Sequence, residues 1–186
     1  MSHDLRHRPL LFVLLSILVG CATPFTRQAS PSSLPKLMAD RLSWMDEVAR
    51  VKQARSLPIN DPKREAELLD AMEQRALAMD LPASAVRAFF TGQMNAAKQL
   101  QLEWIASHTS PPSSATEPLP DLAKTIRPAL DEIGTRMLEA LKKARTSNTG
   151  GSIIVQARQA LTLAGYSESI VAPAIAGLEA GLKVDR

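Results

Sequence analysis

The fold is decided by residues 41–104, which read RLSWMDEVARVKQARSLPINDPKREAELLDAMEQRALAMDLPASAVRAFFTGQMNAAKQLQLEW. Apolar residues recur here at spacings of three and four, the period of an amphipathic α-helix. Pro58 and Pro62 interrupt the pattern, and Pro82 opens it again. Because proline is tolerated between helices and in their first turn, the stretch predicts three helices joined by short connections.

Charged and amide side chains lie on the apolar stripes of these predicted helices. Arg41 follows Met38 by three residues and precedes Met45 by four, and Lys52 lies three turns beyond Arg41 on the same side. Gln101 lies within the stripe of the third helix. A cation in a helical core is costly unless an anion meets it. The stripes carry few acids, which favours a small ligand with several negative groups as the partner. The alternative is that both cations follow the edge of the stripe and reach water.

The whole chain has the composition of an all-α protein. Its 186 residues, rich in Ala and Leu and poor in aromatics and Gly, suffice for one ordinary core. We therefore expect a bundle of about six helices. Pro128 disfavours the helical conformation for the residue before it, which predicts Arg127 at a helix entrance, and Gly165 is expected to cap a helix. The predicted helical regions are 37–55, 62–79, 82–107, 121 to the turn at 146–151, 152–164 and 168–183.

The charge of the chain argues against several classes of function. A net charge of +3, without a basic tract interleaved with aromatics, is too small for a nucleic-acid footprint. No phosphate-binding loop or dinucleotide fingerprint is present. His108 has no evident partner in the sequence, and His3 and His7 precede a predicted cleavage site, so no metal site is expected.

The first residues resemble a bacterial export signal. A basic segment precedes the apolar residues 10–19, and Leu18-Val19-Gly20-Cys21 resembles a lipobox, in which the cysteine is acylated. We expect a signal peptide at 1–21, a flexible tether at 22–36 and an all-helical domain at 37–186. The protein would then be exported to the periplasm and held at the membrane through Cys21. Simple cleavage near Cys21 is the alternative.

A set of residues across four segments carries a more specific resemblance. These residues are Arg41, Lys52, Leu57–Asp61 with Arg64 and Glu65, Phe89–Phe90 with Gln93, Lys98–Gln101, Pro120–Leu122, Arg127 and Arg136–Leu138. In this set the chain is similar to the all-helical chorismate mutases, and its second half to their exported (gamma) branch. This resemblance implies a type II chorismate mutase fold, conversion of chorismate to prephenate without a cofactor, and a homodimer with each site built within one chain.

The resemblance also implies roles for individual residues. Arg41 and Arg127 match the arginines that bind the two substrate carboxylates. Lys52 and Gln101 match the two donors to the ether oxygen whose bond breaks. Arg64 matches a further cation of the pocket.

Two acids and one alanine complete the comparison. Asp61 and Glu65 match acids near the substrate's ring hydroxyl, although Asp61 is equally suited to cap the helix that begins at Pro62, and Glu65 to favour its N-terminus. Ala97 departs from a position that often carries Ser or Thr. Two alternatives therefore stay open: a lyase acting on isochorismate with the same fold, and a lipoprotein that binds carboxylates without catalysis.

Overall fold

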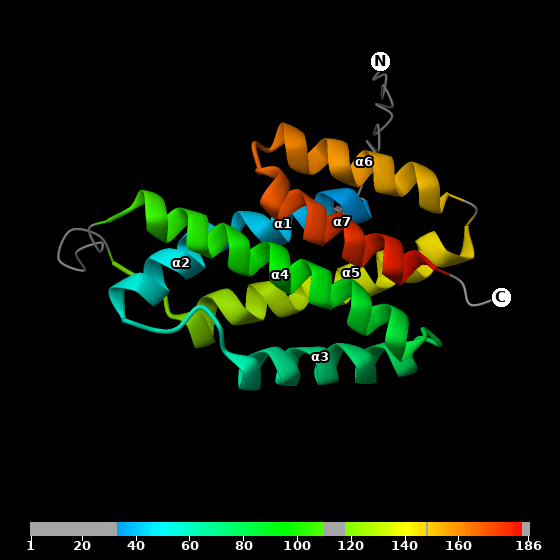
Figure 1. Ribbon diagram of the computed structural model, residues 1–186. Coiled ribbons are helices and arrows are strands. Elements are labelled where there is room, and N and C mark those ends of the chain that lie inside the picture. The colour runs from blue at the N-terminus through cyan, green and yellow to red at the C-terminus, as the bar shows by residue number, and fades with distance from the viewer. Residues whose placement is uncertain (1–32, 110–117, 148, 184–186) are drawn as a thin grey trace, which may run out of the picture. The chain divides into compact units, whose positions relative to one another are not determined.

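The computed structural model describes residues 33–109, 118–147 and 149–183, all within the compact unit Pro31–Arg186. The described residues form α-helices, one π-helical turn and no strand, so the prediction of an all-α fold is confirmed (Figure 1). No described helix is both long and apolar enough to cross a bilayer. The elements are α1 (Leu34–Ser43), α2 (Met45–Ala54), α3 (Pro62–Leu77), α4 (Ala83–Ser107), η1 (Leu122–Ile126), α5 (Arg127–Thr146), α6 (Gly150–Leu163) and α7 (Glu168–Leu182).

The first predicted helix differs from the structure in two ways. It is divided at Trp44, which accounts for the one additional helix. It also begins at Leu34, three residues before the predicted start at residue 37. Leu34 and Pro35 are buried, and Pro35 occupies the first turn of α1, where its missing N–H costs no hydrogen bond.

Helix α3 begins as the sequence predicted. The side chain of Asp61 accepts a hydrogen bond from the backbone N–H of Arg64 at 3.1 Å, and Pro62 follows the cap directly. This cap fixes the direction in which the first turn of α3 leaves the loop. The side chains of that turn therefore have a defined starting position.

Helices α4 and α7 lie side by side in close contact (Figure 1). The approach depends on Gly92 of α4 and Gly177 of α7. A Cβ atom on Gly92 would lie 2.6 Å from the Cα of Gly177 and 2.6 Å from the carbonyl oxygen of Pro173. Both neighbours are backbone atoms and cannot rotate away, so only glycine permits this crossing.

The region around Pro128 corrects one expectation. Arg127 is the first residue of α5, but its backbone is helical (φ −60°, ψ −45°) and continues directly from η1. The N–H groups of Ile126 and Arg127 bond to the carbonyls of Asp121 and Leu122, five residues back. This wider turn carries the helical path through to Pro128 without a break. Arg127 is thus held by helix on both sides.

The C-terminal part follows the predicted pattern closely. Gly165 has φ +86° between α6 and α7, the left-handed conformation expected of a glycine that ends a helix.

In the core, Phe89 and Phe90 of α4 are buried and their rings meet edge to face, with centroids 5.1 Å apart. These contacts fix α4 in the core of the protein.

Candidate active site

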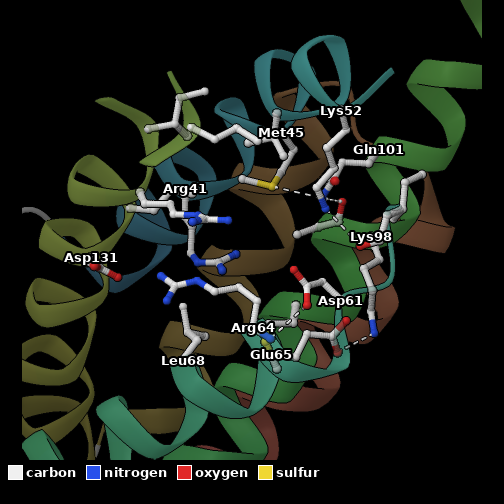
Figure 2. Close-up of a pocket in the computed structure, with 18 residues that line it drawn as sticks. Arg41, Met45, Lys52, Asp61, Arg64, Glu65, Leu68, Lys98, Gln101 and Asp131 are labelled. Carbon is white, nitrogen blue, oxygen red and sulfur yellow. Dashed lines mark hydrogen bonds and ion pairs between the residues drawn. The ribbon is translucent and has the colours of Figure 1, made fainter. Parts of the chain in front are cut away.

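One pocket collects every side chain that the sequence singled out for the site. It has a volume of about 150 Å³ and lies among α1, α2, α3, α4, η1, α5 and the loop before α3 (Figure 2). The structure therefore brings together residues from distant parts of the chain, while their individual roles stay predictions. The predicted residues that line it are Arg41, Lys52, Asp61, Arg64, Glu65, Gln101 and Arg127.

Arg41 is buried, with only 5% of its surface exposed. Its one hydrogen bond among the described residues runs from Nη1 to the main-chain oxygen of Gln93, at 3.4 Å. Burial lowers the pKa of Arg41 to about 10, and the charge of Asp131 opposes that change. The guanidinium is still protonated at neutral pH. The alternative in which Arg41 reaches water at the edge of the stripe is therefore wrong.

Lys52 is held against the loop that precedes α3. Its Nζ donates to the carbonyl oxygen of Ile59 at 3.0 Å. Burial lowers its pKa; Asp61 and Glu65 oppose this change, while the cations Arg127 and Lys98 add to it. A lysine with a lowered pKa in a pocket marks a candidate functional site, because few ordinary surface positions produce this combination.

The N-cap and first turn of α3 contribute three charged groups to the pocket. Arg64 pairs weakly with Glu67 at 3.3 Å, and Figure 2 shows its side chain extending from α3 into the pocket. Glu65 forms an ion pair with Lys98 of α4 at 3.0 Å. Asp61 caps its own helix, as described above. The site role that the resemblance implies for Asp61 adds to this structural role and does not exclude it.

Gln101 has an unused hydrogen-bonding group inside the protein. Its Nε2 donates to the Ala97 carbonyl at 3.0 Å and contacts the Met45 sulfur at 3.6 Å, and its buried Oε1 has no partner among the described residues. An amide offers both donors and an acceptor, and a half-turn about its last bond exchanges them. Gln101 can therefore present an N–H to an oxygen bound in the pocket.

Two charged lining residues were not predicted as site residues. Lys98 lies one turn before Gln101, and Asp131 lies one turn after Arg127. Spacings of three and four residues place such pairs on one helix face, so the signal was present in the sequence. Lys98 belongs to the matching segment Lys98–Gln101, but no role was predicted for it, and nothing in the sequence distinguished Asp131 from an ordinary solvated charge.

The combined lining suits electrostatic binding of an anion. Five cations and three acids line the pocket, which leaves two positive charges in excess, and Met45, Val48, Leu68 and Met94 supply apolar walls. No Ser, Cys or His is among these lining residues, and no described group of His, Cys, Asp and Glu is arranged to hold a metal ion. The arrangement can bind a dianion and stabilise developing negative charge.

Comparison with known proteins identifies the family. Residues 32–102 match the family described as chorismate mutase type II. A monofunctional chorismate mutase of Enterobacter agglomerans is 34% identical over 134 residues, covering 70% of this chain and 73% of the relative. A secreted chorismate mutase of Yersinia pestis is 30% identical over 105 residues, covering 56% and 55%.

A solved structure agrees with these sequence matches. The chorismate mutase of Burkholderia thailandensis superposes with a TM-score of 0.66 at 32% identity, covering 80% of this chain and 96% of that one. The matched family region spans α1 to α4 almost completely and so includes six of the seven predicted site residues. The chain belongs to the type II chorismate mutase family.

Proposed function

We propose that this protein converts chorismate to prephenate in the pocket described above. The observation that supports this most is Arg41, a buried cation that has no anionic partner within hydrogen-bonding reach among the described residues and that lines the same cavity as Lys52 and Arg127. A buried charge of this kind is costly unless a ligand compensates it. A substrate with two carboxylates matches the two positive charges in excess.

Arg41 and Arg127 bind the two carboxylates of the substrate. The planar guanidinium fork can donate to both oxygens of one carboxylate, which fixes orientation as well as position. Arg41 is buried and Arg127 is exposed, so one carboxylate is held deep in the pocket and the other near its mouth. Holding the flexible substrate in its folded, reactive shape lowers the barrier by orientation.

Lys52 and Gln101 stabilise the transition state. The rearrangement breaks a carbon–oxygen bond and concentrates negative charge on the ether oxygen. A fixed ammonium and an amide N–H at that oxygen bind it more strongly in the transition state than in the ground state. In this proposal Arg64 adds positive potential, and Asp61 and Glu65 interact with the ring hydroxyl. No covalent step and no cofactor is needed.

A direct assay tests this proposal. Purified protein is mixed with chorismate and, separately, with isochorismate, and the products are separated chromatographically. Prephenate from chorismate supports the proposal, whereas pyruvate from isochorismate would assign the lyase activity instead. Turnover of neither substrate, together with calorimetric binding of chorismate, would indicate a binding protein without catalysis.

Export and membrane attachment belong to the same proposal. The signal peptide at 1–21, the acylated Cys21 and residues 22–32 of the tether lie outside the described residues. Support comes from the lipobox-like sequence and from similarity to a relative named as secreted. Mass spectrometry of the membrane fraction should find a lipid on Cys21 at the new N-terminus. An unmodified N-terminus in the periplasmic extract would favour simple cleavage.

Assembly as a homodimer is proposed from the resemblance to the exported branch alone. Sedimentation of the purified protein across a range of concentrations measures it. A single species with the mass of one chain at all concentrations would exclude the dimer.

A further inference from the structure

Three carboxylates line the pocket, and two of them already have partners. Asp61 accepts the backbone N–H of Arg64, and Glu65 pairs with Lys98. The carboxylate of Asp131 forms no hydrogen bond or ion pair with any other residue in the described part of the chain. Asp131 is therefore the lining acid whose carboxylate has no hydrogen-bond or ion-pair partner in the described part of the chain.

Asp131 acts on the pocket's cations through space. It lies one turn after Arg127 on α5, is partly buried, and raises the pKa of Arg41 without contacting it. Figure 2 shows Asp131 on the α5 side of the pocket, the side towards which the Arg64 side chain extends. One carboxylate thus shares the cavity with three guanidinium groups.

We propose that Asp131 determines how many negative charges a ligand of this pocket carries. The proposal rests on the proposed function of the pocket as a dianion site. With Asp131 ionised, the lining has two positive charges in excess, which matches a dianion. Without it the excess is three, and a ligand with a third anionic group gains more than a dianion does.

The physical reason is a balance between the empty and the occupied pocket. In the empty pocket Asp131 reduces the mutual repulsion of the guanidinium groups. In the occupied pocket it repels the ligand's carboxylates, and this repulsion grows with the charge of the ligand. Such a repulsive element lowers affinity for the preferred ligand slightly and for more highly charged competitors strongly, which is how specificity against them arises.

Calorimetric titration with malate, a dicarboxylate, and citrate, a tricarboxylate, tests the proposal. The protein is compared with its Asp131→Asn and Asp131→Glu variants at mildly alkaline pH and low salt. We expect Asp131→Asn to lower the Kd for citrate by about tenfold and that for malate by about threefold, since tenfold corresponds to about 1.4 kcal/mol, an ordinary size for one nearby charge. Asp131→Glu should keep the original ratio of the two constants.

Glu132→Gln is the matched control. Glu132 is the next residue on α5, is exposed and does not line the pocket, so its neutralisation changes the net charge of the protein equally. Both dissociation constants should stay as they are in this variant. The proposal is overturned if Asp131→Asn does not improve citrate binding, if it changes both ligands by the same factor, or if Glu132→Gln has the same effect.

Thermal unfolding of each variant checks that the fold is intact, and Asp131→Ser serves as a second neutral variant if Asp131→Asn does not fold. The KM for chorismate should fall by about threefold in the neutral variants, in line with the malate constant. Absence of chorismate turnover in the unmodified protein would refute the proposed function. The malate and citrate titrations would still decide the role of Asp131, so the two failures are distinguishable.

Discussion

Arg41 on α1 donates from Nη1 to the main-chain oxygen of Gln93 on α4, at 3.4 Å. The Gln93 side chain is also buried, and its Nε2 donates to the carbonyl of Ala174 on α7 at 3.4 Å. Helix α7 therefore touches the residue that orients Arg41, although no α7 residue lines the pocket. Among the described residues the main-chain carbonyl of Gln93 is the one hydrogen-bond acceptor of the Arg41 guanidinium, which leaves most of its donors available to a ligand.

Replacing Arg41 by methionine should separate stability from activity. The free energy of unfolding is expected to rise by about 1–2 kcal/mol, because an apolar side chain of similar length replaces a poorly compensated buried charge. The value of kcat/KM should fall by about 10²-fold or more, the usual loss when one member of a buried charge pair is removed. Urea unfolding and steady-state kinetics measure the two effects.

Arg158→Met is the control for that variant. Arg158 pairs with Glu168 on the surface and does not line the pocket. Its replacement should leave kcat/KM unchanged. A loss of stability in Arg41→Met would show that the buried guanidinium is better compensated by the protein than its single hydrogen bond indicates.

Lys52→Ala should reduce turnover with little change in structure. Removal of one donor to a developing oxyanion typically costs about 10²–10³ in kcat. Circular dichroism should show unchanged helicity, because alanine favours helix. Lys63→Ala is the matched control, since Lys63 is exposed on α3 outside the pocket. Nearly normal turnover in Lys52→Ala would remove Lys52 from the mechanism.

Activity should fall on the alkaline side before the ordinary lysine pKa of 10.5 is reached. Burial lowers the pKa of Lys52, so its required charge is lost as the pH rises through that lowered value. The unfolded chain keeps the proton in this window, so the contribution of Lys52 to the free energy of unfolding increases with pH. As the pH rises through this window, activity thus falls while the contribution of Lys52 to the free energy of unfolding increases.

A pH–rate profile with circular dichroism at each pH measures both quantities. Lys52→Arg should move the alkaline limb to higher pH if it retains activity, because arginine titrates later. An alkaline limb that is identical in both proteins would assign the titration to another group.

Gly92→Ala should destabilise the fold although Gly92 lies outside the pocket lining. The added Cβ meets backbone atoms at 2.6 Å, and overpacking of this kind costs about 1–3 kcal/mol or more. Gly151→Ala is the matched control, for which we expect an increase in stability. No atom lies within 4 Å of a Cβ at Gly151 in α6, so the variant should gain up to about 1 kcal/mol from helix propensity. Equal unfolding midpoints for the two variants would contradict the close crossing.

Most of the fold follows from patterns that are visible in the sequence. Helical periodicity, the Asp61–Pro62 start of α3 and the Gly165 cap are local features, and local features are encoded by neighbouring residues. The division at Trp44 was missed because the apolar period continues through it. The π-helical turn before Pro128 was missed because the same residues also suit a break.

The site was predicted less completely, and for a different reason. Periodicity placed Arg41 and Lys52 on an apolar stripe, and resemblance supplied Arg127, which no local pattern connects to the first helix. Asp131 could not be selected, and Lys98 was matched without a role, since the relevance of both depends on which helix faces which. The carbonyl on α4 that accepts a hydrogen bond from Arg41, and the carboxylate on α5 that acts on it through space, likewise depend on tertiary structure.

The crossing of Gly92 and Gly177 affects how a mutational scan of this protein would be interpreted. Substitutions at Gly177 would lower measured activity by displacing α4, on which Gln101 and Lys98 stand, and would look like losses of catalytic groups. A position that tolerates no substitution would then not have to lie close to the substrate. Soluble protein yield recorded beside each activity value would separate the two kinds of position.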